Sequence, residues 1–113
     1  MERRDKQIIK KILSEIEIAE DMIQGKDLEE FKKDEILKRA ICMTVINIGE
    51  LVKNVTEETR KTNDKIPWRA IAGFRDIAAH KYQTLRMDDV YQTVTEDFGS
   101  LRSELENMLS ATE

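Results

Sequence analysis

Residues that make tight turns or covalent cross-links are scarce in this sequence. Its 113 residues include four glycines, one proline and one cysteine. One cysteine cannot form an internal disulfide. Because the sequence also has only one histidine, a zinc site built from four cysteine and histidine side chains is excluded. So few turn formers disfavour a fold of many strands, while the abundant lysine, glutamate, isoleucine and leucine favour a few long helices.

Long apolar runs are absent as well. The charged N-terminus is not followed by an apolar stretch of the signal-peptide kind, and no segment approaches the roughly 18 apolar residues that a membrane helix needs. A lone cysteine is typical of the reducing cytoplasm. We therefore expect a cytoplasmic protein without a membrane partner, and the length predicts a single domain covering residues 1–113.

Charge is unevenly distributed along the chain. The whole sequence has 19 basic and 23 acidic residues, and this net charge of -4 excludes a uniformly basic nucleic-acid coat protein. Between residues 60 and 86, however, the net charge is +5, whereas the remaining residues have -9. The basic segment is either an ordinary solvated face or a patch that binds a phosphodiester backbone.

Four stretches repeat apolar residues every three or four positions, which is typical of amphipathic helices. They cover residues 8–23, 37–55, 68–79 and 90–108. The polar residues 56–65 lose this period, which predicts a connector. Because only short links join the four stretches, we predict an all-α fold, an antiparallel four-helix bundle.

The links also contain signals for helix ends. Asp27 and Glu30 have the spacing of a capping box. Asp34 and Asp88 are predicted to be N-caps of the helices that follow them. Pro67 suits the first turn of a helix, where its missing N–H costs nothing.

Most enzyme chemistries are excluded by the residue inventory. The four glycines never cluster, so neither a phosphate-binding loop nor a dinucleotide fingerprint is present. The residue three before His80 is Ile77, which excludes the Glu-x-x-His pair of a di-metal carboxylate bundle. Cys42 lies within an apolar stripe far from the single histidine, and we expect it to be a buried packing residue.

The basic segment contains the one run of residues that suggests chemistry, from Gly73 to Tyr82. On a helical wheel Arg75 and Tyr82 fall about 20° apart, and Asp76 and His80 are neighbours at i and i+4. We expect these four side chains to converge at one end of a helix. The competing interpretation of His80 is a structural hydrogen-bonding residue.

The spacing Arg75-x4-His80-x-Tyr82 resembles the signature of the HEPN superfamily. In particular it resembles that of the HepT-type toxins, which pair with a minimal nucleotidyltransferase antitoxin. Residues 48–50 (Ile-Gly-Glu) and 66–68 (Ile-Pro-Trp) resemble the same family's pattern. The resemblance therefore covers essentially the whole chain.

The resemblance implies an endoribonuclease that works without a metal ion or other cofactor. His80 would take the proton of the RNA 2′-hydroxyl and later protonate the leaving 5′-oxygen, while the guanidinium of Arg75 would bind phosphate oxygens. One histidine cannot be protonated and unprotonated at once, so a homodimer that brings two motif helices to one cleft is implied. Asp76 stands where the family commonly has asparagine, and its carboxylate would raise the pKa of His80.

The same resemblance implies an antitoxin that uses ATP to transfer AMP to the Tyr82 hydroxyl, adding bulk and negative charge that exclude RNA. If the resemblance is set aside, Tyr82 is simply an aromatic residue at a helix end. Glu50 either orients Arg75 or is solvated. Arg69 and Lys81 are candidate contacts to RNA phosphates.

Two other interpretations stay open at this point. The chain could be a non-catalytic HEPN-like module that binds a nucleotide or a nucleotidyltransferase, since binding and cleavage would use the same basic cleft. It could also be a helical dimerisation domain in which Arg75 and His80 merely solvate an interface. In all three cases Trp68 is expected to anchor the core or an interface.

Overall fold

The computed structural model describes residues 1–112, and this part of the chain is helical without any strand. The prediction of an all-α fold is confirmed. The elements are α1 (Arg3–Ile23), α2 (Leu28–Lys33), α3 (Glu35–Lys53), α4 (Glu57–Thr62), α5 (Trp68–His80), the 3-10 helix η1 (Tyr82–Thr84), α6 (Met87–Gln92), the π-helix η2 (Thr93–Asp97) and α7 (Phe98–Thr112). None of these helices is both long enough and apolar enough to cross a membrane.

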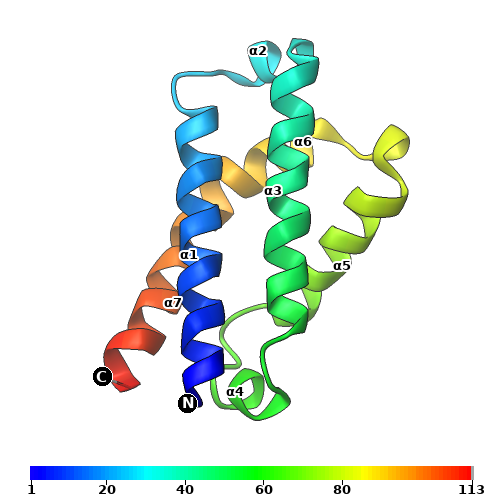
Figure 1. Cartoon of the computed structure of the whole chain (residues 1–113). Coiled ribbons are helices and arrows are strands. Elements are labelled where there is room, and N and C mark those ends of the chain that lie inside the picture. The colour runs from blue at the N-terminus through cyan, green and yellow to red at the C-terminus, as the bar shows by residue number, and fades with distance from the viewer. Residues whose placement is uncertain (113) are drawn as a thin grey trace.

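Helix α3 is central to the arrangement. It packs along α1 on one side and along α5 on the other, and α7 packs against α1. Successive long helices run in opposite directions, as Figure 1 shows for α1, α3 and α5. Helices α6, η2 and α7 follow one another without a break, so they occupy the place of the fourth predicted helix.

The core consists of the predicted apolar stripes. Fully buried side chains come from α1, α2, α3 and the last long helical segment, among them Ile9, Ile12, Ile16, Phe31, Ile41, Ile48, Val94 and Leu105. Trp68 is buried at the start of α5, and its Nε1 donates a hydrogen bond to the carbonyl oxygen of Asn63 at 3.0 Å. The indole thus anchors α5 to the core and to the preceding loop.

Two of the predicted helix starts are confirmed. Asp27 Oδ1 accepts a hydrogen bond from the Glu30 amide at 2.8 Å, and Glu30 Oε1 accepts one from the Asp27 amide at 3.1 Å. This reciprocal pair is the capping box expected from the sequence. Asp34 accepts a hydrogen bond from the Leu37 amide at 3.0 Å and so caps α3.

Other predicted ends differ from the structure. Asp88 is not an N-cap, because α6 begins one residue earlier at Met87; its carboxylate instead pairs with Lys32 at 3.2 Å. Pro67 is the N-cap residue of α5 and not part of its first turn. The predicted connector at residues 56–65 contains α4, a helix of under two turns that is too short to show an apolar period.

A buried carboxylate fastens α4 to α1. Asp5 is fully buried and accepts hydrogen bonds from the hydroxyls of Thr56 and Thr59, both at 2.6 Å, and from the Thr56 amide at 3.2 Å. Burial raises the pKa of Asp5, but the hydrogen bonds from Thr56 and Thr59 outweigh it and the net shift is downward. The ionised carboxylate is therefore the form that the fold selects.

Candidate functional site

Arg75 lies on the face of α5 that packs against α3. Its Cα, Cβ and Cγ lie opposite Gly49, so closely that a Cβ added at Gly49 would overlap the Arg75 side chain. Glycine at this position therefore lets the two helix backbones approach each other. The approach leaves the Arg75 side chain only 21% exposed.

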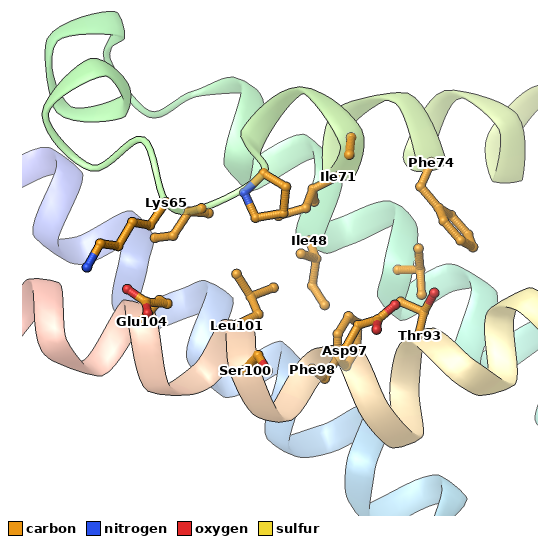
Figure 2. Close-up of a pocket in the computed structure, with 14 residues that line it drawn as sticks. Ile48, Lys65, Ile71, Phe74, Thr93, Asp97, Phe98, Ser100, Leu101 and Glu104 are labelled. Atoms are coloured by element: carbon orange, nitrogen blue, oxygen red, sulfur yellow. The ribbon is translucent and has the colours of Figure 1, made fainter.

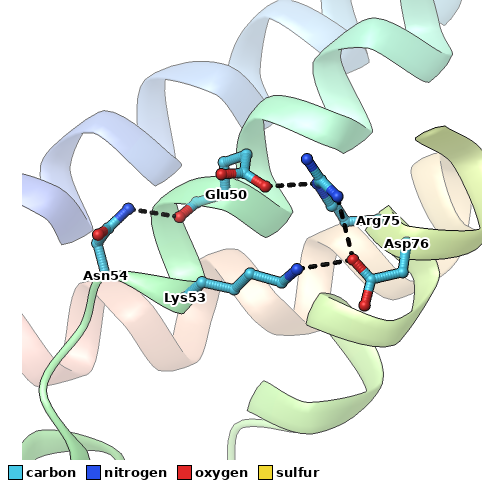
Figure 3. A network of polar contacts seen from close by, with 5 residues as sticks. All are labelled: Glu50, Lys53, Asn54, Arg75 and Asp76. Atoms are coloured by element: carbon cyan, nitrogen blue, oxygen red, sulfur yellow. Dashed lines mark hydrogen bonds and ion pairs between the residues drawn. The ribbon is translucent and has the colours of Figure 1, made fainter.

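Two carboxylates hold the Arg75 guanidinium in place (Figure 3). Its Nε pairs with Glu50 Oε1 at 2.5 Å, and its Nη1 pairs with Asp76 Oδ1 at 3.1 Å. The same Asp76 oxygen accepts a hydrogen bond from Lys53 Nζ at 2.7 Å. At the end of α3, Asn54 Nδ2 donates to the Glu50 carbonyl oxygen at 2.9 Å. Arg75 is thus fixed in direction by groups from both α3 and α5.

The charge of Asp76 serves this network. The hydrogen bond from Lys53 lowers the pKa of Asp76, burial opposes that shift, and Arg75 lowers the pKa further. The expected partnership of Asp76 with His80 is not among the contacts of the described residues. Asp76 is paired with Lys53 and Arg75 instead.

His80 is the last residue of α5 and is exposed to solvent. No hydrogen bond or ion pair of the His80 side chain occurs within residues 1–112. His80 is five positions after Arg75, which turns the two side chains about 140° apart around the helix axis. Arg75 therefore points to α3 while His80 remains open to a partner or ligand.

Tyr82 does not continue the helix of the motif. The backbone leaves the helical conformation at Lys81 (φ -134°, ψ 39°), and Tyr82 begins the separate helix η1. Its proximity to Arg75 on a helical wheel is therefore a wrong prediction. The Tyr82 hydroxyl donates instead to Glu35 Oε1 at 3.4 Å, and the Arg39 guanidinium lies 5.0 Å from its ring centroid.

The predicted residues thus fall into two places on α3. Arg75 is held near Glu50, whereas Tyr82 contacts Glu35. The rise of a helix separates Glu35 and Glu50 by about 20 Å. His80, two residues before Tyr82, lies in the chain between the two contact points.

The candidate phosphate contacts Arg69 and Lys81 are both exposed. Arg69 is in the first turn of α5 and Lys81 directly follows its last residue. Helix rise places them about 18 Å apart. The positive charge of the segment is therefore spread along α5 and not gathered at one end.

An apolar cavity lies elsewhere, between α5 and α7. It has a volume of about 360 Å³, and Ile71 and Phe74 of α5 line it together with Phe98 and Leu101 of α7 (Figure 2). Its walls are mainly apolar, and it contains none of the predicted site residues. The Phe74 side chain thus faces this cavity, whereas the side chain of the next residue, Arg75, faces α3.

Cys42 and the acidic residues show no arrangement for metal or thiol chemistry. Cys42 is buried as expected, and burial raises the pKa of its thiol to about 11. Within residues 1–112 no three histidine, cysteine, aspartate or glutamate side chains are gathered closely enough to hold a metal ion.

Sequence reasoning did not single out four residues that contact the predicted site: Glu35, Lys38, Arg39 and Lys53. Three of them have the i, i+3 and i, i+4 spacing of ordinary ion pairs on a solvated helix. What distinguishes Glu35 and Arg39 is the contact that each makes with Tyr82, which lies 47 residues after Glu35 in the chain. No local pattern reports such a contact.

The fold and these residues define a small helical protein with an arginine and a histidine on one helix and a tyrosine two residues after the end of that helix. The family model described as Ribonuclease HepT-like matches residues 12–108. The chain belongs to this HepT-like family.

Two curated relatives match over most of their length. "Putative RNase TTE0752" of Caldanaerobacter subterraneus subsp. tengcongensis is 34% identical over 98 residues, which cover 87% of this chain and 88% of the relative. "Probable ribonuclease HepT" of Thermococcus cleftensis is 30% identical over 108 residues, which cover 96% of this chain and 98% of the relative. No solved structure gives a significant match.

Proposed function

We propose that this protein is the toxin of a toxin–antitoxin pair and cleaves RNA without a metal ion, at a site that Arg75 and His80 form in a homodimer. The observation that carries the proposal is the fixed direction of Arg75, whose Nε pairs with Glu50, together with an exposed His80 at the end of the same helix. Membership of the HepT-like family and the names of the curated relatives support RNA as the substrate. A cytoplasmic location belongs to the same proposal.

The chemistry divides between the two side chains. His80 in its neutral form takes the proton of the 2′-hydroxyl, whose oxygen attacks the neighbouring phosphorus. The bond from phosphorus to the 5′-oxygen breaks, and a protonated His80 of the partner subunit supplies the proton to that oxygen. Arg75 binds the non-bridging oxygens, where negative charge accumulates in the transition state.

A second copy of the chain is needed because one protomer has one histidine. Large apolar side chains are exposed on the two helices that hold the site: Ile36 (83%) and Met43 (56%) on α3, and Ile77 (48%) on α5. Contact with a partner would remove the apolar surface of these side chains from water. We propose that four-helix bundles pair through these helices, so that two copies of His80 face one RNA-binding cleft.

Control by the antitoxin acts on Tyr82. In this proposal a nucleotidyltransferase transfers AMP from ATP to the Tyr82 hydroxyl. Tyr82 follows His80 by two residues, so an attached nucleotide covers the exposed end of α5. Its phosphate adds negative charge where an RNA phosphate would bind, and repulsion then excludes the substrate.

Cleavage of purified RNA in the presence of EDTA tests the activity. We expect the wild-type protein to cleave, and His80→Ala to reduce the rate by about two orders of magnitude or more. Lys10→Ala, which removes an exposed cation from α1, is the matched control and should cleave as the wild type does. RNA binding without products would contradict the proposal and favour a non-catalytic module. Loss of wild-type cleavage in EDTA would overturn the metal-independent mechanism.

A further inference from the structure

Tyr82 and three charged residues of α3 form one connected group, which we call the Tyr82 cluster: Glu35, Lys38, Arg39 and Tyr82. Glu35 is its centre. Its Oε1 accepts from the Tyr82 hydroxyl at 3.4 Å and from Arg39 Nε at 3.0 Å, and its Oε2 pairs with Lys38 Nζ at 2.9 Å. The Arg39 guanidinium also lies 5.0 Å from the Tyr82 ring centroid.

Lys38 is much less exposed to solvent than the other two charged residues of the cluster, Glu35 and Arg39. The Lys38 side chain is only 19% exposed, so its ammonium is held beside Glu35 and is poorly screened by solvent. The Arg39 side chain is 61% exposed and the Glu35 side chain 53%. The cluster therefore has one largely buried cation, Lys38, and a second cation, Arg39, that is largely exposed to solvent together with the carboxylate of Glu35.

The protonation states suit an acceptor of a phosphoryl group. Burial raises the pKa of Tyr82, so its hydroxyl is protonated at neutral pH. The hydrogen bond from Lys38 lowers the pKa of Glu35, which keeps this carboxylate ionised. A protonated hydroxyl must lose its proton when it becomes a nucleophile, and the ionised carboxylate of Glu35 already accepts a hydrogen bond from that hydroxyl.

We propose that the Tyr82 cluster is the acceptor site for the adenylyl group: Glu35 takes the hydroxyl proton, and Lys38 and Arg39 bind the α-phosphate of ATP. This inference rests on the modification of Tyr82 in the proposed function. In the step, the Tyr82 oxygen forms a bond to the α-phosphorus of ATP, and the bond from that phosphorus to the bridging oxygen breaks. Pyrophosphate leaves, and the hydroxyl proton passes to Glu35. Protein kinases use a carboxylate in the same way for a substrate hydroxyl.

The charge of the cluster matches this product. One carboxylate and two cations give the cluster a net charge of +1 while Tyr82 is neutral. A tyrosyl phosphodiester has one negative charge, so the modified cluster is neutral once Glu35 has released the hydroxyl proton to solvent. Arg39 can leave Glu35 for the new phosphate through its planar guanidinium, and Lys38 stays beside both anions.

The experiment measures the rate of AMP attachment to the full-length chain by intact mass spectrometry. The chain is incubated with its nucleotidyltransferase partner and ATP over a range of ATP concentrations. We expect Glu35→Gln to lower the maximal rate by about a hundredfold with little change in the ATP concentration at half-maximal rate. We expect Arg39→Gln to lower the rate by about tenfold, and Arg39→Lys, which keeps the charge, to recover most of it.

Two controls separate the possible failures. Tyr82→Phe should show no adduct, and Lys10→Gln, which removes a cation outside the cluster, should be modified at the wild-type rate. If wild-type protein gains no AMP on Tyr82, the proposed modification falls and this inference falls with it. If wild-type protein is modified on Tyr82 and the Glu35 and Arg39 variants react equally fast, the inference alone is overturned. Thermal unfolding of each variant shows whether it is folded, and a folded Glu35→Gln that reacts slowly while Lys10→Gln does not supports the inference.

Discussion

Gly49 and Arg75 pack so closely that the Arg75 side chain begins where a Cβ of residue 49 would lie. The next residue of α3, Glu50, pairs with Nε of the same arginine. Two adjacent positions of one helix thus set how near Arg75 comes and where its guanidinium points. This relationship links the packing of α3 on α5 to the proposed chemistry.

Gly49→Ala should therefore disturb both stability and activity. The added methyl group must displace the backbone of α5, and overpacking of this kind costs about 1–3 kcal/mol of unfolding free energy. The RNA cleavage rate should fall by a larger factor than the fraction of folded protein, because the added methyl group also displaces the Arg75 side chain. Chemical denaturation and the RNA cleavage rate, measured on the same samples, check this.

Gly99→Ala is the matched control for that change. Gly99 is also helical, in α7, but nothing lies within 4 Å of a Cβ added there. Replacing an uncrowded helical glycine by alanine usually stabilises by about 0.5–1 kcal/mol. Equal effects of the two substitutions would contradict the close approach of Gly49 and Arg75.

The carboxylate of Glu50 should matter for activity more than for stability. Glu50→Gln keeps the shape of the side chain but removes the charge that holds Arg75 Nε. Since the Glu50 side chain is 48% exposed, the loss of unfolding free energy should stay below about 1 kcal/mol. We expect cleavage to slow by about tenfold, because a less well held guanidinium binds the transition state less well.

Glu57→Gln provides the comparison. Glu57 pairs with Lys61 at 3.2 Å on α4, and both side chains are largely exposed. Its loss should change neither cleavage nor stability by a measurable amount. If Glu50→Gln cleaves at the wild-type rate, Glu50 is a solvated carboxylate with no part in placing Arg75.

Much of the fold could be predicted because amphipathic helices have local patterns of apolar and capping residues in the sequence. The apolar period identified the long helices, and the capping residues Asp27 and Asp34 fixed the starts of α2 and α3. The short helix α4 was not predicted, since six residues are too few to show an apolar period. Asp88 was misjudged because an aspartate in the first turn of a helix and one at its N-cap look alike in a sequence.

The site was predictable only in part, for a different physical reason. The spacing of Arg75, His80 and Tyr82 could be read directly, but the place where α5 ends could not. Because the helix stops at His80, Tyr82 turns to Glu35 and not to Arg75. Such contacts between distant segments depend on how helices pack, which no local pattern encodes.

Asp5 predicts a specific dependence of stability on pH. Its pKa is lowered in the folded protein, so the unfolded chain takes up its proton at a higher pH than the folded one. The stabilisation is complete well above the unfolded pKa of about 3.9 and is lost as the pH falls through the folded pKa. The neutral variant Asp5→Asn lacks this dependence, and leaving Thr56 or Thr59 without its acceptor should cost about 1–3 kcal/mol at neutral pH.

Denaturant unfolding of the wild type and of Asp5→Asn at pH 7 and at pH 3 measures this directly. The difference in unfolding free energy between them should shrink at the lower pH. Asp21→Asn, on the exposed part of the same helix, is the control and should show no such change. A difference that stays constant from pH 7 to pH 3 would show that the Asp5 charge plays no part in fastening α4.

The proposed dimer can be tested with two isoleucines of equal exposure. Ile77 on α5 is 48% exposed and Ile18 on α1 is 47% exposed. Replacing either isoleucine by glutamate should therefore remove a similar amount of apolar contact within its own protomer. Only Ile77 lies on the helix that contains Arg75 and His80. We expect Ile77→Glu to shift the protein to monomers in analytical ultracentrifugation and to lower cleavage by at least about tenfold, because a buried unpaired charge opposes association. Ile18→Glu should leave both unchanged. A monomeric Ile77→Glu that cleaves RNA at the wild-type rate would mean that one histidine suffices, and the two-histidine mechanism would then be wrong.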